Sequence, residues 1–146
     1  MAALRPWIAY MIGGGTPLSV RNTLKASETF KAGDFVVLDS NEDVLEASSA
    51  DQTPLYGMAA ENAADVVEAG FVMVHPFTDN LVIAITGDND PTADDVNQQF
   101  GWVEDGDGIY TVDGTDTVNV ALHVIDVDTN RNLYFCKVLA ADRVLG

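Results

Sequence analysis

The feature that most constrains the fold is a series of short apolar runs separated by turns rich in Gly, Asp and Asn. The run 35–38 follows a turn at 31–34, and a second turn at 39–43 returns the chain through 44–47. Gly, Asp and Asn give turns their backbone freedom, and Val, Phe and Leu favour a pleated strand. The pattern therefore predicts a hairpin of two short strands, followed by a third apolar run at 55–60.

The second half of the chain continues this pattern. Its apolar runs predict strands at 71–75, 81–85, 108–112, 117–126 and 133–139. The run 81–85 is apolar throughout, which predicts burial on both faces, and it lies close enough to 71–75 to pair with it as a hairpin. The run 117–126 alternates between two faces and should form a further hairpin with 133–139.

One short helix is expected at 92–101. Thr92 can cap its first turn, acidic residues follow, and Gly101 can end it. Seven or eight short strands with acidic turns and one small helix are typical of an antiparallel barrel or sandwich. The sequence therefore predicts a mainly β fold without a second globular domain.

The charge of the chain is large and uneven. The formal net charge is −16 over 146 residues. Residues 1–31 hold four basic side chains and one acidic, a net of +3, whereas the rest hold three basic and 22 acidic, a net of −19. Such a charge repels DNA, RNA and anionic membranes, so we predict neither a nucleic-acid nor a membrane partner.

The N-terminal segment does not follow the strand pattern. Residues 7–12 are apolar without clean periodicity, and Gly13, Gly14 and Gly15 interrupt them. A signal peptide is one reading, but the apolar run is short and no clear cleavage site follows it. A membrane span needs about 20 apolar residues and is excluded.

We instead interpret residues 1–27 as an extended arm, followed by a single β-rich domain at 28–146. The apolar side chains of the arm need another surface to cover them, either its own domain or a neighbouring subunit. From composition, the candidate partner-binding residues of the arm are Arg5, Trp7, Ile8, Tyr10 and Met11.

No motif in the chain carries catalytic chemistry. His75 and His123 lie far apart in sequence, and we favour strand residues over a metal or catalytic pair. Cys136 lies in an apolar run, which indicates a buried thiol. The acidic turns at 88–90 and 104–108 lack the register and flanking helices of an EF-hand, so solvated turn acids are favoured over a calcium site. We predict no enzymatic activity, no cofactor and no metal.

The order of elements resembles a known group of viral proteins. After the arm come the turn and valine strand at 30–38, the Pro-Leu-Tyr-Gly segment at 54–59, the acidic turn at 87–92 and the strand end at 124–128. This layout, over residues 28–139, resembles the head decoration (cement) proteins of tailed bacteriophages. The resemblance implies a small antiparallel β-barrel or β-tulip-like domain with one short helix and an extended N-terminal arm.

The resemblance also implies a function. Proteins of this kind bind the outer surface of an expanded capsid, often as trimers, with an arm that reaches across neighbouring subunits of the major capsid protein. We therefore expect a homotrimeric structural protein of the virion. The alternatives are another virion β-structure, such as a tail tube, fibre or adhesin module, and a small-ligand barrel that uses His75, His123 or the acidic loops.

Overall fold

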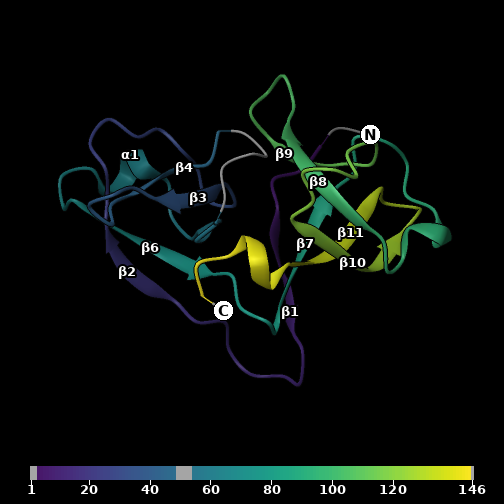
Figure 1. The fold of residues 1–146 in the computed structure, drawn as a ribbon. Helices are drawn as coiled ribbons and strands as arrows, with labels where there is room; N and C mark the ends of the chain where they lie inside the picture. The colour runs from purple at the N-terminus through teal and green to yellow at the C-terminus, as the bar shows by residue number, and fades with distance from the viewer. Residues whose placement is uncertain (1–2, 49–53, 146) are drawn as a thin grey trace.

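The computed structural model describes residues 3–48 and 54–145, and within them the chain forms eleven strands, one four-residue α-helix and two short 3-10 turns. The strands belong to two antiparallel sheets, which lie side by side in Figure 1. The predicted mainly β fold with one short helix is confirmed. No helix in the described ranges is long and apolar enough to cross a membrane.

The larger sheet has six strands. In spatial order they are β1 (Trp7–Met11), β7 (Leu81–Thr86), β11 (Leu133–Val138), β10 (Leu122–Asp128), β8 (Gln99–Glu104) and β9 (Tyr110–Asp113). A parallel bridge between Gly87 and Val112 brings β9 back beside the residue that follows β7. This isolated bridge curls the sheet, but the ladders between described strands do not form a closed barrel.

The smaller sheet has five strands. In spatial order they are β2 (Val20–Thr23), β6 (Phe71–Pro76), β5 (Gly57–Ala59), β3 (Phe35–Leu38) and β4 (Val44–Glu46). Helix α1 (Ala63–Val66) packs with one cluster of this sheet, which includes Phe30 and Val72. Alternate side chains of the same strands, among them Phe35 and Met58, belong to a core that they share with the larger sheet.

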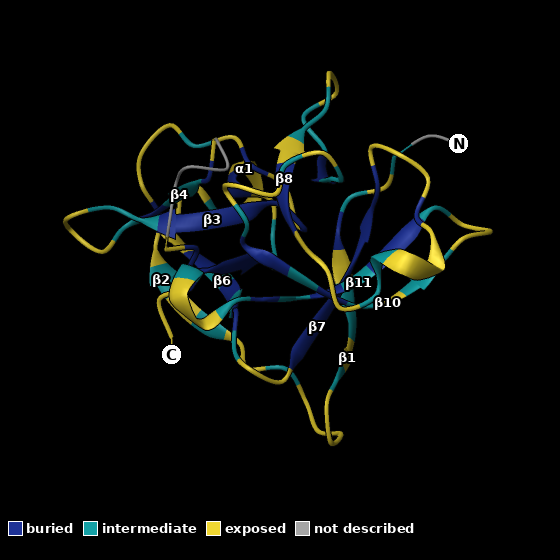
Figure 2. Ribbon diagram, turned by 45° about the vertical axis from the view of Figure 1, so that its right-hand side comes forward, coloured by how far each residue is buried: buried dark blue, intermediate teal, exposed yellow. Residues whose placement is uncertain are grey.

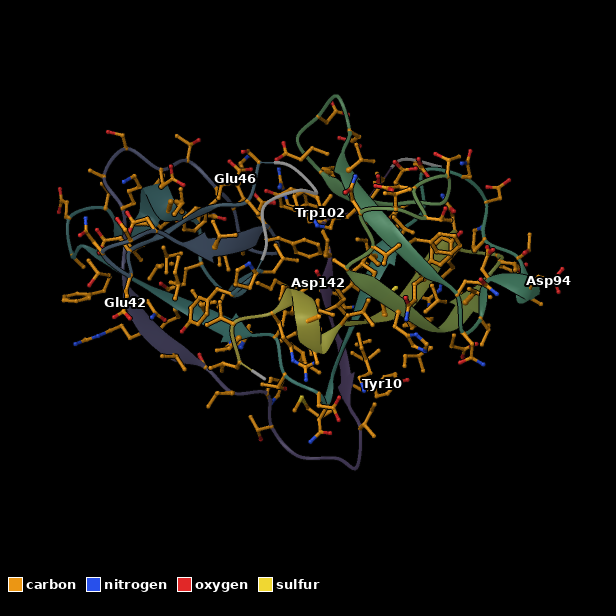
Figure 3. All side chains as sticks on the ribbon, in the orientation of Figure 1. Tyr10, Glu42, Glu46, Asp94, Trp102 and Asp142 are labelled. Atoms are coloured by element: carbon orange, nitrogen blue, oxygen red, sulfur yellow. The ribbon has the colours of Figure 1, made fainter. Side chains whose placement is uncertain are left out.

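An aromatic cluster joins the two sheets. The Phe35 ring of the smaller sheet stacks on Tyr110 of the larger sheet, with ring centroids 4.9 Å apart. Trp102 meets Phe35 and Tyr110 edge-on at 5.6 and 5.0 Å, and Phe77 meets Phe35 at 5.4 Å. Figure 3 shows Trp102 between the two halves of the molecule. Aromatic pairs with these geometries add to the free energy of burial, so this cluster is a main contact between the sheets.

Several predicted strands and hairpins are confirmed. β3 pairs with β4, and β10 pairs with β11, both as antiparallel neighbours. All six residues of β7 are buried, as its unbroken apolar run predicted. β10 starts at Leu122 rather than at 117, and Val118 before it is 84% exposed.

The predicted hairpin between 71–75 and 81–85 is wrong. β6 pairs with β2 and β5 of the smaller sheet, whereas β7 pairs with β1 and β11 of the larger one. After Pro76, the backbone N–H of Phe77 donates to the Tyr56 carbonyl, and the buried Phe77 ring packs on Phe35. The aromatic side chain thus holds the connection in the core, and the chain crosses from one sheet to the other.

The helix predicted at 92–101 is also wrong in its extent. Thr92 does form a capping box with Asp95, but only a 3-10 turn at Ala93–Asp95 follows. Val96 is extended, and Asn97 has a positive φ of 69°, so the helix cannot continue. Gly101, predicted as the helix stop, lies inside β8.

The N-terminal segment, expected as an extended arm, lies along both sheets in this structure. β1 is the end strand of the larger sheet and β2 the end strand of the smaller one. Figure 2 shows both in the colours of intermediate and exposed residues, in contrast to the dark-blue central strand β7. Two stretches of this segment are therefore edge strands of the fold.

Candidate functional site

The edge strand β1 contains a β-bulge. Its register on β7 shifts between Ile8 and Tyr10, so that Ala9 is an extra residue. In a regular strand, residues three apart point to opposite faces. Here Trp7 and Tyr10 are both exposed, at 36% and 45%. Ile8 and Met11 instead pack against the shared core. The bulge thus turns two aromatic side chains outward while β1 keeps two apolar anchors inward.

Further exposed apolar side chains flank these aromatics before and after the strand. We define the β1 surface as Leu4, Trp7, Tyr10, Ile12 and Leu18. Figure 3 shows Tyr10 on the outer side of β1, away from the central Trp102. Exposed apolar side chains on and beside an edge strand are typical of an interaction surface, and an unpaired strand edge can also accept a further strand.

A shallow hollow lies between β1 and the smaller sheet. It encloses about 320 Å³ and is lined by Pro6, Trp7, Ile8, Ala32, Gly33, Met58, Ala59, Ala60 and His75. Most of these side chains are apolar. The Nδ1 atom of His75 lies 3.1 Å from the carbonyl oxygen of Leu18, which holds the segment before β2 against β6. The hollow therefore extends the β1 surface toward the smaller sheet.

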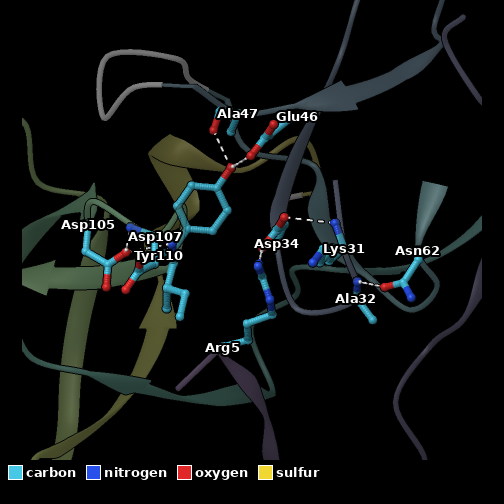
Figure 4. Close-up of polar contacts among 11 residues, drawn as sticks. Arg5, Lys31, Ala32, Asp34, Glu46, Ala47, Asn62, Asp105, Asp107 and Tyr110 are labelled. Atoms are coloured by element: carbon cyan, nitrogen blue, oxygen red, sulfur yellow. Dashed lines mark hydrogen bonds and ion pairs between the residues drawn. The ribbon is translucent and has the colours of Figure 1, made fainter. Parts of the chain in front are cut away.

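An ion pair fixes the chain just before β1. The Arg5 guanidinium contacts the Asp34 carboxylate at 2.5 Å, and the backbone N–H of Lys31 donates to the same carboxylate at 2.9 Å (Figure 4). Asp34 is buried, and this burial raises the pKa of its carboxyl, although the hydrogen bond from Lys31 and the charge of Arg5 act in the opposite direction. Arg5 is therefore held in an internal pair.

The turn before β3 contacts the N-terminal segment directly. Gly33 has a φ of +94°, and a Cβ built on it would lie 2.5 Å from the carbonyl oxygen of Pro6. Only glycine fits both this backbone conformation and this approach. The neighbouring Ala32 N–H donates to Asn62 Oδ1 at 2.9 Å (Figure 4). The start of β1 is thus packed onto a turn that is itself anchored beside α1.

The structure divides the five candidate residues of the sequence analysis into three groups. Trp7 and Tyr10 are exposed on the β1 surface, Ile8 and Met11 pack inward, and Arg5 pairs with a buried carboxylate. Sequence reasoning did not select three members of the surface: Leu4, Ile12 and Leu18. For Ile12 and Leu18 the signal was an apolar side chain beside Gly13 or Pro17 in a segment without a regular period, and Leu4 carried no comparable signal.

The other chemical candidates do not converge. His75 lies on β6 of the smaller sheet and His123 on β10 of the larger one. Within the described ranges, no group of three or more His, Cys, Asp or Glu side chains could hold a metal ion. Cys136 is buried, and burial raises the pKa of its thiol. Asp105 Oδ1 accepts hydrogen bonds from two backbone N–H groups of its own turn, which is a structural use of an acidic loop.

What remains is an exposed surface built from an edge strand, exposed aromatics and a shallow apolar hollow. Apolar side chains on such an edge can be buried against another chain. Searches against family models, curated proteins and solved structures found no match in any of the three.

Proposed function

We propose that this protein is a non-enzymatic structural component of a phage virion. It binds the outer surface of the capsid and stabilises it by cross-bridging neighbouring subunits of the major capsid protein. The observation that carries the proposal is the β1 surface. Trp7 and Tyr10 are exposed on a strand that, among the described residues, has a neighbour in the sheet on one side only. Apolar side chains on such an edge are suited to burial against a partner chain.

The uneven charge supports a position outside the shell, with the β1 surface toward the capsid. The N-terminal residues 1–31, which include β1 and β2, carry a net of +3, whereas the rest of the chain carries −19. The acidic part repels packaged DNA and suits a surface that faces solvent outside the shell. The segment that carries the β1 surface is the part of the chain that lacks this repulsion.

The proposal includes a homotrimer and a barrel or β-tulip-like domain, as in the proteins that the sequence resembles. The bridge between Gly87 and Val112, which returns β9 toward β7, supports a barrel-like curvature of the larger sheet. A trimer presents the β1 surface three times. Once one copy is bound, the others are held at a high effective concentration near the shell, so weak contacts combine into firm attachment.

The proposed contact uses a strand of the folded domain as well as its flanking segments. Ile8 and Met11 anchor β1 in the core, and Arg5 is paired with Asp34. Trp7 and Tyr10 are thereby presented in a fixed geometry, which lowers the entropy lost on binding. Cross-bridging follows if the β1 surfaces of one trimer contact different capsid subunits.

Co-sedimentation with undecorated, expanded capsids tests the proposal. The mass of the purified protein is measured first by light scattering and should correspond to three chains. Wild-type protein should then bind to saturation at a fixed ratio to the shell protein. The double variant Trp7→Ser/Tyr10→Ser should lose most of this binding. Val118→Ser, which removes an apolar side chain that is 84% exposed elsewhere, should bind like wild type.

Two outcomes would overturn the proposal. Absence of wild-type binding to capsids would remove the decoration role itself. Full binding by the folded double variant would show that the β1 surface is not the contact. Circular dichroism of all three proteins establishes that the comparison is made between folded chains.

A further inference from the structure

The hydroxyl group of Tyr110 lies between two acceptors on the opposite sheet. Its oxygen is 2.6 Å from the carbonyl oxygen of Ala47 and 3.0 Å from Oε1 of Glu46 (Figure 4). Tyr110 belongs to β9, and Glu46 ends β4. The Tyr110 ring is fully buried and stacks on Phe35, so the hydroxyl oxygen has a fixed position. Both acceptors therefore meet the same phenol.

A phenol has one hydrogen to donate. The shorter contact assigns this hydrogen to the carbonyl of Ala47, because short distances mark the stronger O–H···O bonds. The contact between Glu46 and the Tyr110 oxygen then needs a hydrogen of its own. The carboxyl group of Glu46 is the group that can carry it. With an ionised Glu46, two oxygen atoms with lone pairs would face each other.

The surroundings of Glu46 favour the protonated form. Burial raises the pKa of its carboxyl, and the negative charges of Glu104, Asp34 and Glu28 act in the same direction, against the opposing effect of the hydrogen bond with Tyr110. Glu28 also accepts a hydrogen bond from the backbone N–H of Glu46 at 2.5 Å, which fixes this acid close by. The Arg5 guanidinium is paired with Asp34, so its positive charge offsets the Asp34 carboxylate rather than Glu46.

We propose that Glu46 and Tyr110 form a proton-sensitive contact between the two sheets. While Glu46 is protonated, its carboxyl donates to the Tyr110 oxygen, and the Tyr110 hydroxyl donates to the Ala47 carbonyl. When Glu46 releases its proton to solvent, the first of these bonds is lost and a carboxylate faces the phenol oxygen. The end of β4 is then held less firmly against β9.

The sign of the pH effect follows from linkage. A carboxyl whose pKa is raised on folding binds its proton more tightly in the folded state. The stabilisation is fully present below the ordinary Glu value of 4.5 and is lost as the pH rises through the raised folded value. The contact should therefore be firmer at mildly acid pH than at neutral pH.

The first test uses a residue that keeps the donor without the charge. In Glu46→Gln, the amide N–H can donate to the Tyr110 oxygen at any pH. We expect a higher melting temperature for this variant at about pH 7 than for the control Glu68→Gln, which removes an exposed carboxylate. The gain in stability of wild type between about pH 7 and about pH 5 should persist in the control and shrink in Glu46→Gln. A lower melting temperature for Glu46→Gln, with the wild-type pH dependence retained, would overturn the proposal.

The second test reads the proton directly. Carboxyl carbon chemical shifts report the titration of Glu46 in the folded protein. In Tyr110→Phe the acceptor of the Glu46 proton is absent, so the titration should move to lower pH than in wild type. A move to higher pH would show that the phenol donates to an ionised carboxylate, and that result would overturn the proposal. Glu46→Gln provides an independent answer should Tyr110→Phe fail to fold.

Discussion

β7 and β1 are neighbours in one sheet, yet they have opposite environments. β7 has a strand on either side, and all six of its residues are buried. Within the part of the chain that the structure describes, β1 pairs with β7 alone, and Trp7 and Tyr10 remain exposed on it. Figure 2 shows the contrast between the dark-blue β7 and the largely teal β1. The side chains of β7 are all buried, whereas those of β1 point partly into the core and partly to the outside.

The largest effect that this contrast predicts is a loss of stability from β7. Ile83 is 1% exposed and belongs to the shared core, so Ile83→Ala leaves a cavity there. We expect a loss of about 2–5 kcal/mol in the free energy of unfolding, measured by denaturant titration. Ile12→Ala, at the exposed end of the β1 surface, is the matched control and should lose far less. Equal losses would show that the two strands do not differ in this way.

The next effect concerns the anchor of β1. In Asp34→Ala, the Arg5 guanidinium and the Lys31 N–H lose a buried acceptor. We expect a cost of about 1–3 kcal/mol, since a buried donor without its partner is costly. Hydrogen exchange should accelerate in β1 more than in β7. Arg131→Ala, which breaks an exposed ion pair, serves as the control. Uniform acceleration across the sheet would contradict a local anchor.

A smaller effect is predicted for the exposed aromatics. Trp7→Ser and Tyr10→Ser should each change the free energy of unfolding by about 0.5 kcal/mol or less, because exposed substitutions cost little. Thermal and denaturant unfolding of each variant both measure this change in the free energy of unfolding. A loss of several times that size would mean that these side chains hold β1 in place, and that they are not free for a partner.

The smallest effect is a pH dependence at the turn that precedes β7. A hydrogen bond from Lys137 lowers the pKa of the exposed Asp79 carboxyl, with help from the charges of Lys137 and Arg143. A lowered pKa gives stability that is present above the ordinary value of 3.8 and lost as the pH falls through the folded value. Asp79→Asn should be less stable than wild type at about pH 6, and the difference should narrow at about pH 3. A difference in stability that stays the same at both pH values would exclude the Asp79 carboxylate as the source of the pH dependence.

The central strands could be read from the sequence because local chemistry dictates them. The unbroken apolar run at 81–85 has no stable place outside a core, and the turn at 39–43 has no alternative to a hairpin return. The connection after Pro76 looked like another hairpin turn. What sends it to the other sheet is the packing of Phe77 on Phe35, a contact between residues far apart in sequence. Spacing along the chain carries no signal for such a contact.

The candidate site shows the same limit. Composition drew attention to Trp7 and Tyr10, but it could not separate them from Ile8 and Met11, which point inward. That separation depends on the bulge at Ala9, which arises from how β1 meets β7. The contact between Glu46 and Tyr110 was not anticipated either, because it joins two residues that are 64 positions apart in the sequence.

The bulge in β1 also makes this surface unequally tolerant of different kinds of genetic change. A substitution at Trp7 or Tyr10 alters one side chain and leaves the rest of the strand in place. Deletion of Ala9 makes Trp7, Ile8, Tyr10 and Met11 consecutive, and strict alternation then keeps both aromatics on one face and both anchors on the other. A residue inserted between Tyr10 and Met11 would instead turn Met11 away from the core. Across diverging sequences, the length of β1 should therefore vary more readily at the bulge than beside it.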